Sequence, residues 1–184
     1  IKDQRFRFVP HDLDTLLRGN PTKDIWGYTD LDGLEKFLNH PDIIPLYYAK
    51  FLDLIDRVYR PEIIQPVIAR AVGGFVSDNA LEGLQEFVPE RIANVLSQIP
   101  RSYSATSNLS ATQEGYLRTS SGSVNFSGNF HAAEVRAVLV NGVLAVMNAK
   151  DGVWSLSVPE GGGEVLNPGL NRVVIEFYSG KFGS

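Results

Sequence analysis

The sequence contains no cysteine among its 184 residues. Disulfide bonds, thiolate catalysis and cysteine metal sites are therefore excluded, whereas the compartment stays open because many secreted bacterial proteins also lack cysteine. No apolar run approaches the roughly 18 residues that span a bilayer, so we expect no membrane span. A formal net charge of −4 leaves no excess of basic residues to attract nucleic acid or anionic lipid, and we expect neither as a partner.

The sequence also starts without a methionine, a signal peptide or a transit segment. We therefore interpret the chain as an excised or processed piece of a longer protein. Its content of hydrophobic residues, 43%, is enough for a sizeable core and for one or two domains.

The stretch that points most directly to chemistry is a short alternating segment that ends in two carboxylates. Arg5–Phe8 alternates basic and aromatic residues, which is the period-2 pattern of a half-buried strand, and Pro10 ends the strand because proline has no N–H to donate. Asp12 and Asp14 follow directly, and two carboxylates at a strand end can hold one Mg²⁺ together with water and phosphate oxygens. The pattern also fits an Asp-rich turn, because Asp readily bonds its own backbone.

The same Asp-x-Asp spacing recurs at Asp30 and Asp32. These acids precede apolar residues at helical spacing, so we interpret them as cap and first-turn residues that complement the helix dipole. Because context separates the two copies, we predict that the metal ligands are Asp12 and Asp14.

Apolar residues recur at spacings of three and four between residues 30 and 99, which predicts a series of helices. The predicted helices cover Leu31–Leu38, Asp42–Tyr59, about Pro61 or Gln65 to Phe75, and Asn79–Ile99. Asn79 with Glu82 has the pattern of a capping box that opens the last helix, and Pro89 is expected to bend or divide it.

After residue 100 the composition changes to serine, threonine, asparagine and glycine, and residues 101–112 have the composition of a linker. Short period-2 segments follow, with hairpin signals at Asn141-Gly142 and Asp151-Gly152. Short strands at this spacing predict an immunoglobulin-like β-sandwich at residues 113–184. We expect Trp154 to pack in its core rather than to serve as a carbohydrate platform.

The first half of the chain resembles the CotH family of spore-coat protein kinases, whose usual motif is an aromatic strand, Ile-Pro, Trp and then Asp-x-Asp. Phe6–Asp14 carries this likeness, although His11 stands where the family usually has Trp. Three downstream parts are also similar to family segments: Leu38–Asp42 with Tyr47–Tyr59, Arg60–Glu62, and Leu84–Arg91. The resemblance covers about residues 5–99, and the ordered set is more specific than any single motif.

The resemblance implies that residues 1–100 form the α-helical C-terminal lobe of an atypical protein-kinase-like fold. It implies that Asp12 and Asp14 are ligands of Mg²⁺ or Mn²⁺ with ATP, and that Asp12 is also catalytic. The implied reaction transfers phosphate from ATP to serines of secreted or surface proteins, at the surface of a bacterial cell or spore. Phosphoryl transfer depends chiefly on positioning and on neutralising phosphate charge, which gives carboxylate-bound metal a central role.

The resemblance further implies that the nucleotide-binding half precedes Ile1, so we expect the fragment alone to be inactive. Two other classes of function stay open. One is a non-catalytic extracellular surface or adhesion protein that keeps the kinase-like helices as a scaffold for an Ig-like binding module. The other is a secreted carbohydrate-binding protein whose β-sandwich binds sugar.

Overall fold

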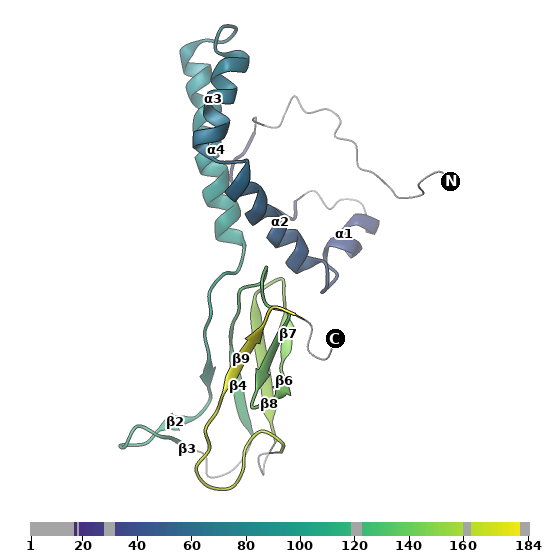
Figure 1. Cartoon of the computed structure of the whole chain (residues 1–184), viewed down its shortest axis with the longest axis vertical. Helices are drawn as coiled ribbons and strands as arrows, with labels where there is room; N and C mark the ends of the chain where they lie inside the picture. The colour runs from purple at the N-terminus through teal and green to yellow at the C-terminus, as the bar shows by residue number, and fades with distance from the viewer. Residues whose placement is uncertain (1–16, 18, 28–31, 119–122, 160–162, 181–184) are drawn as a thin grey trace, which may run out of the picture. The chain divides into compact units, whose positions relative to one another are not determined.

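The structure is a computed structural model, and it describes residues 17, 19–27, 32–118, 123–159 and 163–180. Its described part combines α-helices in the first half of the chain with antiparallel β-sheets in the second (Figure 1). Contacts between residues divide the chain into two compact units, each made of two separate stretches of the sequence. The first unit is Ile1–Ile25 with Leu54–Leu96, and the second is Trp26–Asp53 with Ser97–Ser184.

The described residues form four α-helices close to the predicted positions. Their bounds are α1 Asp32–Leu38, α2 Ile44–Arg57, α3 Pro61–Val72 and α4 Asp78–Gln98. Pro61 occupies the first turn of α3, where its missing N–H costs nothing, so this helix begins at Pro61 and not at Gln65. Helix α2 contributes to both units, because the boundary between them falls after Asp53.

Helix α4 begins with a different cap from the predicted one. Ser77 precedes the helix, and its Oγ accepts a hydrogen bond from the Ala80 N–H at 3.4 Å. Asn79 lies inside the first turn, so the predicted capping box with Glu82 is wrong. Serine caps a helix about as well as asparagine, and the helix takes the earlier of the two. Pro89 lies inside α4 without dividing it.

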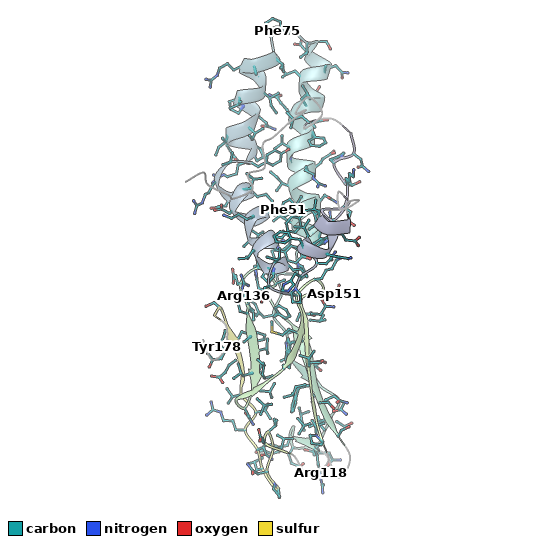
Figure 2. All side chains as sticks on the ribbon, turned by 90° about the vertical axis from the view of Figure 1, so that its right-hand side faces the viewer. Phe51, Phe75, Arg118, Arg136, Asp151 and Tyr178 are labelled. Atoms are coloured by element: carbon teal, nitrogen blue, oxygen red, sulfur yellow. The ribbon has the colours of Figure 1, made fainter. Side chains whose placement is uncertain are left out.

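Helices α3 and α4 pack side by side as a hairpin in the first unit (Figure 1). Ile68 and Val88 are buried, and the Gln65 side chain donates a hydrogen bond to the Gln85 carbonyl at 3.1 Å. The helix predicted for this part of the sequence extended to Phe75. The helix ends before this residue, which lies in the turn at the free end of the hairpin and is 88% exposed (Figure 2).

The second unit contains three antiparallel sheets in its described part, with strand orders β1-β4-β8-β7, β6-β5-β9 and β2-β3. The strand bounds are β1 Thr106–Ser107, β2 Ser110–Ala111, β3 Leu117–Arg118, β4 Val124–Asn129, β5 Ala137–Val140, β6 Val143–Leu144, β7 Val146–Asn148, β8 Val153–Val158 and β9 Ile175–Tyr178.

The core of the second unit lies where the two larger sheets meet. Strands β4 and β8 pair along their whole length, from Val124 opposite Val158 to Asn129 opposite Val153. Trp154 of β8 is only 2% exposed, and its ring meets that of Phe177 in β9 edge to face with centroids 6.4 Å apart. The prediction that Trp154 packs in the core is thus confirmed.

The predicted Asn141-Gly142 turn joins β5 to β6 and has positive φ at both residues, 48° and 83°. This geometry matches the twist of a hairpin and is well tolerated by asparagine and glycine. The Asn141 side chain has a further role that the turn signal did not indicate. It donates to the Val165 and Arg172 carbonyls at 2.9 and 3.1 Å and accepts from the Val174 N–H at 2.7 Å, which anchors the segment before β9.

Residues 101–112, predicted to be a linker, include strands β1 and β2. Thr106 pairs opposite Ser127 of β4. Ser104 also exchanges two hydrogen bonds with Asn129: its N–H donates to the Asn129 carbonyl at 3.1 Å, and its Oγ accepts from the Asn129 N–H at 2.9 Å. The serine-rich composition of this segment indicates that its side chains are exposed. The edge of β4, however, needs partners for its backbone N–H and C=O groups, and the backbone of a polar segment supplies them as well as that of an apolar one.

Candidate functional site

The predicted metal ligands Asp12 and Asp14 lie outside the described residues, as does Asp30. Asp32 is the first residue of α1, which agrees with the helix start predicted for this second Asp-x-Asp copy. Within the described ranges, no group of three His, Cys, Asp or Glu residues could hold a metal ion.

The segment downstream of the Asp12–Asp14 motif is an ordered turn, residues 19–25, in the first unit. Asn20 organises it: the Asn20 Oδ1 accepts hydrogen bonds from the Thr22 N–H at 2.8 Å and from the Thr22 hydroxyl at 2.6 Å. The Asn20 carbonyl accepts a third bond, from the Lys23 N–H at 3.2 Å. At the end of the turn, Ile25 is 2% exposed. The turn is therefore closed by its own hydrogen bonds and anchored by a buried side chain.

Arg91 of α4 fastens this turn to the helices of the first unit. Its Nη1 donates to the Pro21 carbonyl at 3.1 Å and also to the Lys23 carbonyl. Asn94, on the same face of α4, accepts from the same nitrogen at 2.9 Å. All three acceptors lie within reach of this one nitrogen, which carries two hydrogens, so two of the three bonds share a hydrogen.

Tyr59 also lies near Arg91. Burial raises the pKa of the Tyr59 hydroxyl above its ordinary value, and the nearby positive charge of Arg91 opposes this rise. Tyr59 and Arg91 are both half-buried.

In the second unit, aromatic side chains gather where Trp26 meets helix α2. The ring of Trp26 lies 4.9 Å from that of Tyr47 and 5.7 Å from that of Tyr48, and Tyr47 stacks edge to face on Phe51 at 4.8 Å. Tyr48 is 1% exposed. These rings form one packed cluster, whose face is covered by a side chain from the sheets.

That side chain is Lys150, in the turn between β7 and β8. Its Nζ lies 4.5 Å above the Trp26 ring and donates to the Asn39 Oδ1 at 2.7 Å, while its backbone carbonyl accepts from the Tyr48 hydroxyl at 2.8 Å. The turn lies at the opposite end of the sheets from Arg118, as the label of the neighbouring Asp151 shows (Figure 2). Three contacts thus join residues 26–53 to the sheets, and their role is structural.

We predict that Tyr48→Phe lowers the free energy of unfolding by about 1 kcal/mol, because the hydrogen bond from the Tyr48 hydroxyl to the Lys150 carbonyl is lost. Urea denaturation of the whole chain measures this change. Tyr116→Phe is the matched control, because Tyr116 is 62% exposed and should change stability by less than about 0.5 kcal/mol. Equal stability of the two variants would show that the Tyr48 hydroxyl contributes nothing to this junction.

A third group combines Tyr103, His131 and Glu134. The Tyr103 hydroxyl donates to Glu134 Oε2 at 3.1 Å, and His131 Nε2 lies 3.7 Å from Glu134 Oε1. Burial, and secondly the bond to the Glu134 carboxylate, raise the pKa of Tyr103. The Nδ1 of His131 is buried and has no hydrogen-bond partner among the described residues. One histidine and one carboxylate are too few to make a metal site.

Sequence reasoning missed both Arg91 and Lys150. Arg91 is 70 residues from Pro21 along the chain, and Lys150 is 102 residues from Tyr48, so neither contact leaves a local pattern. No helix in the described part of the chain is long and apolar enough to cross a membrane. Comparison of the chain with protein-family models, with curated proteins and with solved structures finds no match.

Proposed function

We propose that this chain is the C-terminal part of a CotH-like atypical protein kinase that transfers phosphate from ATP to serines of secreted or surface proteins. The observation that carries the proposal is the ordered set of segments between residues 5 and 99, which begins with an aromatic strand pattern followed by Asp12 and Asp14. Helices α2, α3 and α4 fall on the downstream segments of this set, which supports the proposal.

In the proposed site, Asp12 and Asp14 hold Mg²⁺ or Mn²⁺, for which paired carboxylates are a suitable donor set. When bound, the metal neutralises charge on the phosphates of ATP, whose other contacts come from the nucleotide-binding half of the protein. Asp12 also accepts the proton of the attacking serine hydroxyl.

We propose further that the sheets of the second unit form an immunoglobulin-like β-sandwich. Two observations support this: the sheets are antiparallel, and side chains of the two larger sheets meet at Trp154 and Phe177. A β-sandwich that follows a kinase-like lobe fits a protein exported to the cell or spore surface.

Asp12→Asn and Asp14→Asn, each introduced into the protein that carries this chain, should abolish Mn²⁺ binding that depends on ATP. Phosphate transfer should fall at least about 100-fold in Asp12→Asn, because a proton acceptor and a metal ligand are lost together. Calorimetry with Mn²⁺ and ATP, and transfer of labelled phosphate to a serine-rich peptide, measure the two effects.

The matched control is Asp32→Asn in the second Asp-x-Asp copy. Loss of a favourable charge at the start of α1 should cost at most about 1 kcal/mol of stability and leave metal binding intact. If Asp32→Asn abolished metal binding without lowering stability, the assignment of Asp12 and Asp14 as the metal ligands would be wrong. Unchanged binding in both Asp12→Asn and Asp14→Asn would leave the non-catalytic scaffold as the better account.

A further inference from the structure

We propose that strand β9 is a docking site for a second copy of this chain, and that the two copies pair antiparallel through their β9 strands. Among the described strands, β9 has β5 as its neighbour on one side and no strand on the other. Figure 2 shows β9 as the outermost strand on the side of the sheets where Tyr178 is labelled. The inference concerns the second unit alone and does not depend on the proposed kinase function.

The free side of β9 presents backbone groups that β5 does not pair. On the other side, the carbonyls of Val174 and Tyr178 accept backbone N–H groups from the residues that flank β5, at 2.9 and 2.7 Å. Successive residues of a strand turn their backbone groups to opposite sides, so those of Ile175 and Phe177 point away from β5. A row of such groups is a template for a further strand.

The core is also less complete beside β9 than beside β5. Phe177 marks the inward face of β9, because its ring meets that of Trp154. All four residues of β5 are buried, whereas Ile175 and Phe177 are only half-buried although they share this inward face. Tyr103, whose ring lies 5.2 Å from that of Phe177, is exposed as well. A strand on the free side of β9 would therefore cover apolar surface in addition to pairing backbone groups.

Little in this segment keeps another strand away. Natural proteins protect edge strands with lysine, proline or inward-pointing charges. Residues 173–178 include no lysine and no proline, and their single charged residue, Glu176, points to the outer face together with Tyr178. Val173 and Val174, which precede the strand, are exposed. β-Branched and aromatic residues of this kind are the ones that strands favour.

The side chains of β9 are complementary to those of a second β9. Because the backbone groups of Phe177 face the free side, an antiparallel ladder can place Phe177 opposite Phe177 of the second copy. This register puts Glu176 opposite Tyr178 of the second copy. The Tyr178 hydroxyl donates to Glu176 of its own strand at 3.1 Å, so the same pair of groups can bond across the interface.

The neighbouring register, with its twofold axis at Glu176, places two carboxylates directly opposite each other. Like charges in that position are destabilising. A twofold axis at Phe177 therefore satisfies the backbone and the charges together, and twofold contacts are the commonest ones between identical chains.

The whole chain should form a dimer with a dissociation constant of about 1 to 100 μM, the range of a small, transient interface. Sedimentation velocity over a series of protein concentrations measures this constant. Ile175→Pro removes an N–H that faces the free side, and Ile175→Ala is its matched control, because it shortens the same side chain but keeps the N–H. By symmetry two hydrogen bonds are lost in Ile175→Pro, so the dimer should weaken about 10- to 30-fold, against less than about threefold for Ile175→Ala.

Phe75→Ser controls for association through the helices, because Phe75 is exposed at the turn between α3 and α4. This variant should dimerise as the unmodified chain does, within about threefold. A chain that stays monomeric at every concentration would overturn the proposal. So would a dimer that Phe75→Ser abolishes and Ile175→Pro leaves intact, because the contact would then belong to the helical hairpin.

The register has a test of its own, which also decides the case if Ile175→Pro does not fold. The chain contains no cysteine, so introduced thiols have no competitors. Glu176→Cys combined with Tyr178→Cys should give a covalent dimer on oxidation, because directly opposite residues lie within disulfide reach, whereas Glu176→Cys alone should remain monomeric on a non-reducing gel.

A covalent dimer from Glu176→Cys alone would refute the register at Phe177, and the absence of cross-linking in both variants would refute pairing through β9. None of these measurements uses ATP or a metal ion. Their failure therefore leaves the proposed kinase function standing, and a failure of that function leaves the pairing of β9 standing.

Discussion

Gly128→Ala should destabilise the second unit by about 3 kcal/mol or more, which is at the upper end of the cost of overpacking. A Cβ at this position in β4 would lie 1.9 Å from the Ser104 carbonyl oxygen and 2.9 Å from Trp154 Nε1. Neither neighbour can move away easily, because Trp154 is buried and donates its own hydrogen bond to the same carbonyl at 3.2 Å. The new methyl group therefore pushes β1 from β4 and breaks the bond that holds the buried indole.

Gly83→Ala is the matched control for this prediction. Gly83 lies inside α4 with no atom within 4 Å of an added Cβ, so alanine should stabilise the helix by up to about 1 kcal/mol. The two variants should thus shift the denaturation midpoint in opposite directions. A Gly128→Ala variant as stable as the unmodified chain would mean that β1 does not approach β4 as closely as described.

A fragment of residues 112–184 should be largely unfolded, whereas a fragment of residues 97–184 should unfold cooperatively. The shorter fragment lacks β1, and it lacks the Ser104 groups that bond Asn129 and Trp154. It also lacks Pro100, whose carbonyl accepts from the Ala132 N–H at 3.0 Å. A unit of roughly 70 residues is marginal even with an intact core, so losing one edge of a sheet is a large fraction of its stability.

Circular dichroism and the dispersion of amide signals in NMR spectra compare the two fragments. In the intact chain, residues 104–107 should also resist limited proteolysis, because Ser104, Thr106 and Ser107 pair with β4. If the 112–184 fragment proved as well folded as the longer one, residues 101–112 would be the linker that their composition indicates. Failure of both fragments would instead show that the second unit needs residues 26–53 as well.

Local patterns predicted what depends on neighbouring residues. Helices α1 to α4 follow from apolar spacings of three and four, because side chains at those spacings share one face of a helix. The Asn141-Gly142 hairpin follows from the tolerance of these two residue types for positive φ. Burial of Trp154 follows from its place in an alternating strand.

Predictions failed where two local signals competed or where a distant partner decided the outcome. Ser77 and Asn79 are both good caps, and composition alone could not choose between them. Residues 101–112 look like a linker because their side chains are polar, yet a strand edge recruits backbone groups, which are the same in every residue except proline.

The candidate site also has a part that local sequence predicts and a part that it does not. The sequence by itself determined that Asp12 and Asp14 are a candidate metal pair and that Asp32 opens a helix, since both inferences use residues within one turn or one strand. Only the tertiary structure decided that Arg91 holds the turn at residues 19–25 and that Lys150 covers the ring of Trp26. Such contacts depend on the path of the whole chain, and a hydrogen bond between residues 70 or 102 positions apart imposes no periodicity that a sequence could reveal.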